Sequence, residues 1–210
     1  SQDFISFWKK QGAKIGEGTY FFDPRSNCLG INNPCNLTIG RNVQVTHGVV
    51  IVDHGYDWSV LKGAYGDVLG GTGQVSIGDN VFIGMNAVIL KNVHIGNNVI
   101  IGAGSVVTHD IPDNSVAGGN PCRVLMPLSV YREKRANAQL KDAINLFDAY
   151  VTASGNMAPE SVISVLGSTN AAFVSNFISQ HVFLRPEEKQ ELLEETRPSR
   201  RPVSYTHLTL

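Results

Sequence analysis

Aliphatic residues recur at every sixth position through the middle of the chain. The β-branched members of this series are Ile77, Ile83, Ile89, Ile95, Ile101 and Val107. A second small or apolar residue follows each of them by four positions, at Val81, Ala87, Val93, Val99, Ser105 and Ile111. The same register runs upstream through Ile39, Val45 and Ile51. A period of six fits neither the roughly 3.6-residue turn of an α-helix nor the alternation of a strand.

This six-residue period predicts a parallel β-helix. Each hexapeptide forms one short strand and a turn, three hexapeptides close a triangular coil, and the aliphatic side chains stack inside the prism. Glycine and asparagine suit the turns because they accept backbone conformations that branched residues resist. A β-sandwich with incidental periodicity is the alternative, but sandwich turns do not recur every six residues.

The repeat is blurred near the N-terminus. Ile15, with Gly16 after it, and Phe21 predict a partial first coil. The segment 23–36 lies out of register, and we interpret it as an irregular turn. The regular repeat then begins at Ile39.

Helical periodicity replaces the six-residue repeat after Met126. One helical stripe is formed by Leu140, Ile144, Phe147 and Val151. We therefore expect residues 1–126 to form a mainly β domain and residues 127–198 to form an α-helical C-terminal extension. Residues 199–210 show no periodicity and are interpreted as a disordered or artefactual tail.

A long insertion interrupts the repeat between Asp53 and Val75. Residues 54–75 are predicted to protrude as a loop. Long loops without structure of their own are uncommon in compact domains and tend to be functional. Aromatic rings pack on sugar faces and carboxylates accept hydrogen bonds from hydroxyls, so this loop suits a polyhydroxyl ligand. The expected substrate-binding residues in it are Tyr56, Asp57 and Trp58.

His54 lies where the loop leaves the last regular strand before it. A residue at that point is anchored by the rigid coil while it faces the loop. Imidazole is the side chain most often used to take a proton from a reacting hydroxyl, which makes His54 the candidate general base. A structural surface histidine is the alternative, and the position in the fold favours function.

Composition narrows the possible partners. The chain has 210 residues, 17% of them charged, and a formal net charge of −1, which gives no reason to expect a nucleic-acid surface.

No apolar run reaches the roughly 20 residues of a transmembrane helix, and the N-terminus lacks the pattern of a secretory signal. Cys28, Cys35 and Cys122 form no CxxC pair. We therefore expect a cytoplasmic protein without disulfides or a metal site.

These features resemble the hexapeptide-repeat acyltransferases. The resemblance covers residues 15–126 and is closest in the segment IGDNVFIGMNAVILKNVHIGNNVIIGAGSVVTHDIPDNSVAGGNPCRVL. The family includes galactoside and maltose acetyltransferases and the sugar O-acetyltransferases of surface-polysaccharide biosynthesis. Membership implies a left-handed β-helix and a homotrimer with each active site between two subunits. It also implies acetyl transfer from acetyl-CoA to a hydroxyl of a small acceptor, which we expect to be a sugar.

The resemblance also suggests how the reaction proceeds. A histidine at the start of the family's protruding loop acts as general base, and His54 in the sequence VDHGYD matches it. Direct attack of the hydroxyl oxygen on the thioester is implied, and the chain contains no GxSxG nucleophile motif. Asp23 is expected in a coil beside the active site, where it contacts the acceptor or orients a histidine. A simple Asp-Pro turn is the alternative.

The acetyl-CoA site can be transferred from the family position by position. The matching residues are Gly84, Met85, Gly102, Ala103, Gly104, Ser105, Thr108, His109 and Arg123. Two positions depart from the family pattern. His109 replaces a lysine, and Met126 replaces a second arginine, so phosphate binding is expected to depend on fewer fixed charges.

Other assignments share parts of this pattern. A nucleotide-sugar N-acyltransferase or an antibiotic (xenobiotic) acetyltransferase is the alternative within enzymes. The xenobiotic enzymes share the loop histidine, so only substrate profiling separates them. A γ-type carbonic anhydrase shares the β-helix but needs three histidines around zinc. His47 and His54 are seven positions apart and should not share a face. A non-catalytic structural subunit is the remaining alternative.

Overall fold

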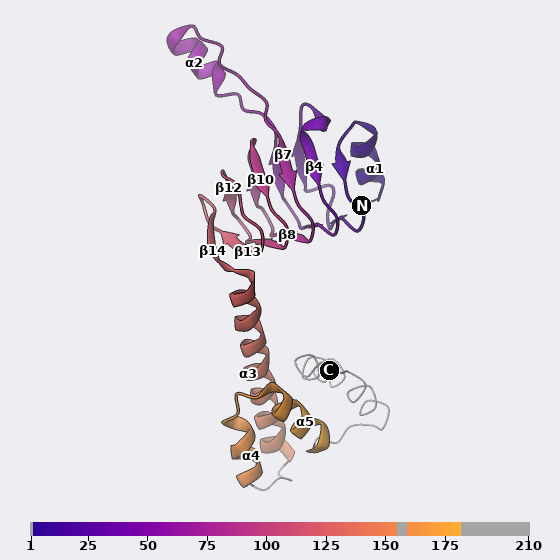
Figure 1. Cartoon of the computed structure of the whole chain (residues 1–210), viewed down its shortest axis with the longest axis vertical. Helices are drawn as coiled ribbons and strands as arrows, with labels where there is room; N and C mark the ends of the chain where they lie inside the picture. Colours follow the sequence, from indigo (N-terminus) through magenta and orange to yellow (C-terminus); the bar gives the residue numbers. More distant parts are fainter. Residues whose placement is uncertain (1, 155–158, 182–210) are drawn as a thin grey trace. The chain divides into compact units, whose positions relative to one another are not determined.

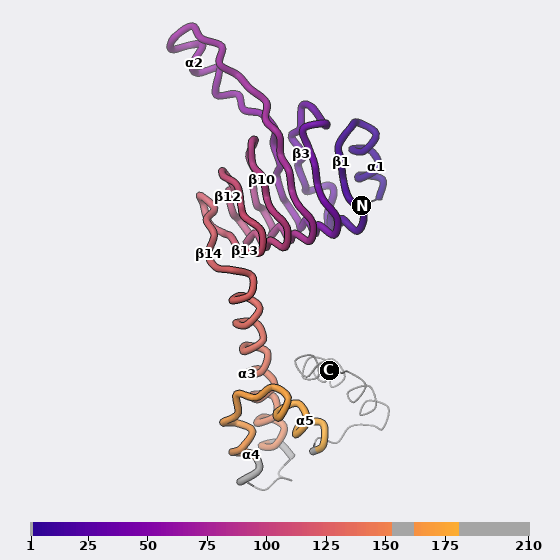
Figure 2. Tube along the Cα trace, in the orientation of Figure 1, coloured from indigo at the N-terminus to yellow at the C-terminus, as the bar shows by residue number. Residues whose placement is uncertain are grey.

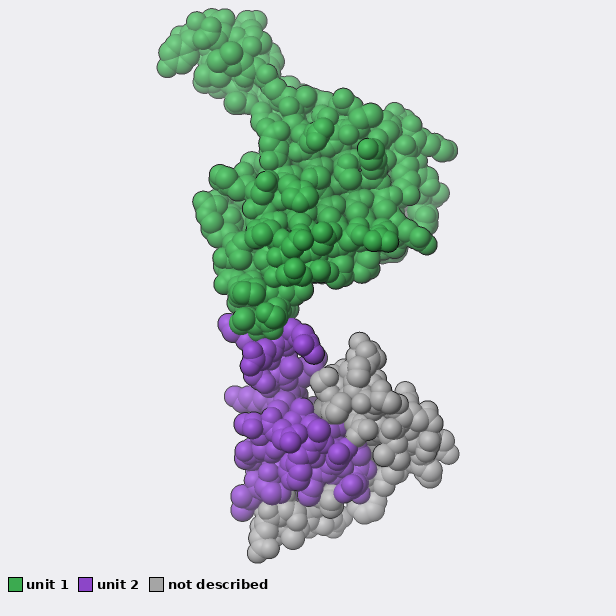
Figure 3. All heavy atoms as spheres, in the orientation of Figure 1, with its two compact units in different colours: residues 1–131 green, residues 132–210 purple. Residues whose placement is uncertain are grey.

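The computed structural model describes residues 2–154 and 159–181. The expected tail, 199–210, lies outside these described residues. The chain divides into two compact units, residues 1–131 and 132–210, which Figure 3 colours separately.

Three sheets form the walls of a triangular prism in the first unit (Figures 1 and 2). Sheet A contains β1 (Lys14–Ile15), β4 (Leu37–Ile39), β7 (Val75–Ile77) and β10 (Val93–Ile95). Sheet B contains β2 (Tyr20–Phe21), β5 (Gln44–Val45), β8 (Val81–Ile83), β11 (Val99–Ile101), β13 (Ser115–Gly118) and β14 (Arg123–Pro127). Sheet C contains β3 (Cys28–Gly30), β6 (Val50–Val52), β9 (Val88–Ile89) and β12 (Val106–Val107). Neighbouring strands run parallel, except that β14 is antiparallel to β13.

Stacked aliphatic side chains fill the prism. The six-residue series pairs in register from coil to coil, so that Ile39 lies opposite Ile77 and Ile77 opposite Ile95. All three are almost fully buried. Burial of such a side chain contributes about 1.5–3 kcal/mol, and each coil obtains it only from its neighbours. The predicted parallel β-helix of hexapeptide repeats is confirmed.

Three corners join the sheets and recur from coil to coil. We name them the AB corner (residues 40–43, 78–80, 96–98 and 112–114), the BC corner (22–27, 46–49, 84–87 and 102–105) and the CA corner (31–36, 53–74, 90–92 and 108–110).

Asparagines shape the AB corner. The residues with positive φ there are Asn42, Asn80, Asn98 and Asn114. Asparagine tolerates this left-handed region better than most residues with a side chain. The amides also form a ladder, in which each Nδ2 donates to the Oδ1 of the next asparagine at 2.9, 2.8 and 3.0 Å.

The first coil differs from the expectation. β3 pairs in register with β6, so the segment 23–36 is not simply an irregular turn. The periodicity is hidden because eight positions, instead of six, separate the inward-facing residues Phe21 and Leu29. The 3-10 helix η1 (Pro34–Asn36) follows β3.

Two helices of the first unit lie outside the hexapeptide repeats, and the six-residue period predicts neither of them. α1 (Gln2–Lys10) packs Phe4 against Phe21, with ring centroids 5.0 Å apart. α2 (Trp58–Tyr65) lies in the long CA loop and has no buried residue. Figure 1 shows that this loop carries α2 away from the stacked coils. The loop therefore protrudes as expected but contains a short helix.

The second unit is helical, as the periodicity indicates. Its helices are α3 (Leu128–Ser154), which begins in the first unit, α4 (Pro159–Leu166) and α5 (Ala171–His181). Their small core consists of Ala143, Phe147, Val165, Val174 and Ile178. Within the described residues, no helix combines the length and the apolar character needed to cross a membrane.

Candidate active site

His54 is held by the carboxylate next to it. Strand β6 ends at Val52, and the Asp53 side chain that follows is completely buried. His54 Nδ1 lies 2.9 Å from Asp53 Oδ1, and the imidazole is 17% exposed. Because a carboxylate only accepts hydrogen bonds, the proton of a neutral His54 sits on Nδ1. The lone pair of Nε2 is then available to take a proton.

Asp53 is fixed by donors from the irregular segment of the CA corner. Its carboxylate accepts from the backbone N–H groups of Asn32 and Asn33 at 2.9 and 3.0 Å and from Asn36 Nδ2 at 3.1 Å. Burial raises the pKa of Asp53, but these bonds and the one from His54 outweigh burial and lower the pKa from 3.8 to about 2. Asp53 therefore stays anionic at neutral pH.

Sequence reasoning did not single out Asp53. The available signal was a carboxylate directly after a buried strand and directly before the candidate histidine. That signal is weak because acidic residues are common at strand ends. The partners that hold the carboxylate belong to a different coil, which only the fold brings close.

The loop is closed at its base beside His54. His54 and Thr72 form an antiparallel bridge, and the Gly73 N–H donates to the Asp53 carbonyl at 2.7 Å. Lys91 Nζ, from the next coil, lies 3.4 Å from the Gly71 carbonyl oxygen. Lys91, which the sequence pattern did not single out either, therefore contacts the returning arm of the loop.

The three expected substrate-binding residues lie at different depths in the loop. Tyr56 contacts His54 edge to face, with ring centroids 5.0 Å apart. Asp57 is exposed and directly precedes α2. Trp58 opens α2, and a Cβ built on Gly70 would lie 3.2 Å from the Trp58 ring, so the ring covers the returning arm. Only Tyr56 is in contact with the candidate base.

Asp23 lies at another corner. It pairs with His47, with 3.0 Å between Asp23 Oδ2 and His47 Nδ1, and both side chains belong to the BC corner. Partial desolvation raises the pKa of Asp23, but the N–H of Arg25, the hydroxyl of Ser26 and His47 lower it overall. Asp23 thus orients a histidine, although that histidine is His47. Its expected contact with the acceptor stays a prediction.

The expected pantetheine residues also lie at the BC corner, in successive coils. The Gly104 N–H donates to the Met85 carbonyl at 2.7 Å, which stacks the turn 102–105 on the turn 84–87. A Cβ at Gly84 would lie 2.5 Å from the Ala103 backbone nitrogen, so this approach requires glycine. Met85 and Ala103 stay exposed.

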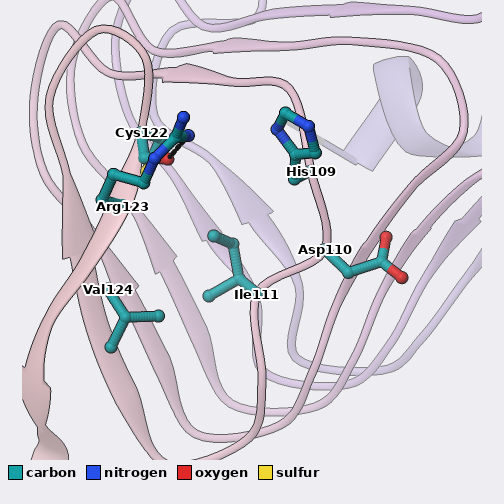
Figure 4. A pocket seen from close by; sticks show the side chains of 6 residues that line it. All are labelled: His109, Asp110, Ile111, Cys122, Arg123 and Val124. Carbon is teal, nitrogen blue, oxygen red and sulfur yellow. Dashed lines mark hydrogen bonds between the residues drawn. The ribbon is translucent and has the colours of Figure 1, made fainter.

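The residues expected at the nucleotide end meet around one pocket of ≈ 320 Å³ (Figure 4). Its lining residues are His109, Asp110, Ile111, Cys122, Arg123 and Val124. Arg123 Nη1 donates to the Cys122 carbonyl at 2.9 Å, and His109 Nδ1 lies 2.7 Å from Thr108 Oγ1. The fold therefore brings together His109 and Arg123, which are far apart in the sequence.

The candidate residues form two groups on opposite edges of sheet C. His54, Thr108 and His109 belong to the CA corner, whereas Asp23, Met85 and Ala103 belong to the BC corner. The strands of sheet C are two or three residues long, so about 10 Å separates the groups within one chain. Among the described residues, no group of three or more His, Cys, Asp or Glu could hold a metal ion.

The repeat region of the chain is similar to known proteins. The family described as "Bacterial transferase hexapeptide (six repeats)" matches residues 74–109. Protein CapG of Staphylococcus aureus is 37% identical over 60% of this chain and 72% of its own length. Galactoside O-acetyltransferase of Escherichia coli K12 is 36% identical over 59% of this chain and 68% of its own length. A solved maltose O-acetyltransferase from Clostridium difficile 630 is 29% identical, covers 59% of this chain and 73% of its own, and superposes with a TM-score of 0.46.

Stacked hexapeptide coils with a loop histidine thus define the class as a hexapeptide-repeat transferase. The chain belongs to the hexapeptide-repeat acyltransferase family.

Proposed function

We propose that this acyltransferase moves an acetyl group from acetyl-CoA to a hydroxyl of a sugar or glycan precursor. The observation that carries the proposal is the Asp53–His54 pair at the loop base, which leaves His54 Nε2 free beside Tyr56. The absence of an activated serine or cysteine motif in the sequence favours direct transfer.

His54 and Asp53 have different roles in the proposed proton transfer. His54 Nε2 takes the proton of the acceptor hydroxyl as its oxygen forms a bond to the thioester carbonyl carbon. The C–S bond then breaks, and the departing sulfur receives the proton from His54. The Asp53 carboxylate stabilises the imidazolium and keeps the ring in place throughout, as the acid of a catalytic triad does.

We assign acetyl-CoA to the two groups of residues around sheet C. Gly84, Met85 and the turn 102–105 present exposed backbone to the pantetheine arm. Arg123 and His109 offer positive charge to the nucleotide phosphates, and Thr108 offers a hydroxyl. Among the residues that line this pocket, Arg123 is the one with a permanent positive charge, so phosphate binding there depends strongly on it.

We further propose that the active site is completed in a homotrimer. The CA and BC groups lie on opposite edges of sheet C, and a neighbouring copy can bring its BC corner to the CA corner of the first. Exposed aromatic residues support an interface, because Tyr20, Phe22 and Phe82 lie on the outer side of sheet B, 42–59% exposed. Large apolar groups in one area are typical of oligomer contacts.

The loop supports a sugar as the acceptor. Tyr56 offers an aromatic ring beside the base, and Asp57 and Trp58 offer a carboxylate and a second ring further along the loop. The experiment is acetyl-CoA turnover by thiol release against sugars, nucleotide-sugars and hydroxylated antibiotics, with Asp53→Asn and His54→Ala as variants. Turnover with sugars that both variants reduce supports the proposal. Turnover confined to antibiotics, or acetyl-CoA binding absent by calorimetry, would overturn it.

A further inference from the structure

The outer face of sheet A is polar, whereas the other two faces are mostly apolar, with Gln44 between Tyr20 and Phe82 on sheet B. One register row across this sheet consists of Lys14, Thr38, Ser76 and His94. Sheet B presents the aromatic residues named above, and sheet C presents valines such as Val50 and Val88. Because apolar faces are the ones that subunit contacts bury, sheet A is the face best suited to remain open to solvent.

A shallow pocket of ≈ 370 Å³ lies on this face, at its edge with the CA corner. Its lining residues are Gln74, Ser76, Asn92, Val93, His94 and Asp110. The volume is within the range of about 300–1,000 Å³ that is usual for small-ligand sites. All of the lining except Val93 can form hydrogen bonds through its side chains.

Part of this polar set is already positioned. Ser76 Oγ and His94 Nδ1 are 2.7 Å apart, which fixes the imidazole and directs Nε2 away from the serine. Asp110 Oδ1 accepts from the His94 backbone N–H at 2.7 Å. This bond goes to the His94 backbone, and among the described residues no hydrogen bond joins Asp110 to the imidazole, so the three residues do not form a proton relay of the Ser-His-Asp type. The arrangement suits binding, not nucleophilic catalysis.

Other polar groups in the pocket are available to hydrogen-bond a ligand. Among the described residues, the Gln74 side-chain amide and the second carboxylate oxygen of Asp110 have no hydrogen-bond partner. Two amides, a hydroxyl, an imidazole and a carboxylate can together donate to and accept from a row of hydroxyl groups. No lysine or arginine lines this pocket, in contrast to the His109–Arg123 pocket, so no fixed positive charge offsets the Asp110 carboxylate and a phosphate or a uronic acid is disfavoured.

The position of the pocket connects it to the proposed chemistry. Gln74 follows Gly73, which is hydrogen-bonded to the residue before His54. Asn92 occupies the same corner as His54, one coil further on. Asp110 belongs to both this pocket and the His109–Arg123 pocket. The polar pocket therefore begins where the returning arm of the loop rejoins the coil, at the same corner as His54.

We propose that this pocket is a second sugar subsite, which binds a neutral, non-reacting unit of an oligosaccharide whose neighbouring unit presents its hydroxyl to His54. The proposal rests on the sugar acetyltransferase function proposed above. It makes the preferred acceptor an oligosaccharide and assigns the specificity for its length to Gln74, Asn92 and His94.

The test compares acceptor pairs of one and two units: glucose with maltose, galactose with lactose, and N-acetylglucosamine with chitobiose. His94→Ala and Gln74→Ala remove pocket contacts. Thr38→Ala is the matched control, because it changes a polar residue of the same row outside the pocket. Wild-type enzyme should show a kcat/KM for at least one disaccharide about tenfold above that of its monosaccharide. The two pocket variants should remove most of that advantage, as expected for one or two lost hydrogen bonds.

Two further readouts separate this proposal from the proposed function. The KM for acetyl-CoA should be the same in wild type and His94→Ala; a rise there assigns the pocket to the acyl donor and overturns the subsite. Saturation-transfer NMR with the same disaccharides measures binding without turnover. Disaccharide binding that His94→Ala weakens and Thr38→Ala does not supports the subsite even if acetyl transfer fails. Equal use of one and two units, or no disaccharide binding, overturns it.

Discussion

The AB and CA corners belong to the same prism but differ in how their polar residues vary from coil to coil. In the AB corner, one device repeats in each coil: an asparagine with positive φ bonded to the asparagine of the next coil. In the CA corner, the equivalent positions of three successive coils hold Asp53, Lys91 and His109, three chemically different groups. Repetition of one residue marks a structural corner, whereas variation of charge at a repeated position marks a functional one.

Hydrogen-bond partners account for the difference. A second set of contacts in the AB corner joins Arg41 to Asp79 at 2.7 Å and the Asp79 N–H to Asn97 Oδ1 at 2.8 Å. The polar groups there bind one another and have little capacity left for a ligand. In the CA corner, His54 keeps one ring nitrogen free, and the residues around it hold it in place without using that nitrogen.

The largest effect is expected at the proposed base. His54→Ala should lower kcat by about 10²–10⁴-fold, because no other group in the CA corner is placed to take the proton from the acceptor. Circular dichroism should stay near wild type and the thermal midpoint should change little, since Asp53 keeps its three other hydrogen-bond donors. Turnover at the wild-type level would remove His54 from the mechanism.

Asp53 should make the stability of the CA corner depend on pH at low pH. Its pKa is lowered to about 2 in the folded chain, so its stabilisation is complete above pH 3.8 and is lost as pH falls toward 2. The loss should be about 2 kcal/mol. Urea unfolding at pH 7 and pH 2.5 should therefore show a smaller change for Asp53→Asn than for wild type. Equal changes in the two proteins would mean that the folded carboxylate titrates normally.

Arg123 should affect the donor and leave chemistry largely intact. Arg123→Ala removes the one permanent cation of the nucleotide pocket, so the KM for acetyl-CoA should rise about tenfold. The value of kcat at saturating acetyl-CoA should change little. Arg123→Lys is the matched variant and should recover part of the affinity. An unchanged KM in Arg123→Ala would place the nucleotide elsewhere.

The smallest effect on activity is expected in the AB corner. Asn98→Gly keeps a residue that accepts positive φ but removes two rungs of the ladder, which should cost about 1 kcal/mol of unfolding free energy. Kinetic constants should match wild type, because the ladder contacts nothing in the CA corner. A clear fall in kcat would show that the two corners are coupled and would contradict the division drawn here.

The sequence predicts the prism well because the residues that determine each coil lie within its own short repeats. Each hexapeptide carries its own inward aliphatic and its own turn residue, so the strands from Leu37 to Val107 follow from the period alone. The first coil was harder to predict because its corner is two positions longer, which hides β3. α1 was missed because a single short amphipathic helix has no repeat to reveal it.

The candidate site was only partly predictable. His54 could be found because it adjoins the break in the repeat, and the acetyl-CoA positions followed from the family resemblance. The partners of Asp53 could not, because Asn32, Asn33 and Asn36 meet it only when the coils stack. For the same reason the sequence did not separate the BC group from the CA group, and it assigned His94 no role.

The closed base of the CA loop allows the loop to vary in length and sequence. The loop leaves and rejoins the coil at one place, where His54 bridges Thr72 and Gly73 binds Asp53. Closure cost grows only slowly with length, so residues 55–71 can be extended, shortened or exchanged without moving the coils. The loop can therefore be exchanged as a unit: the prism keeps the Asp53–His54 pair and the proposed donor site constant, and under the proposed function the acceptor preference changes with the loop.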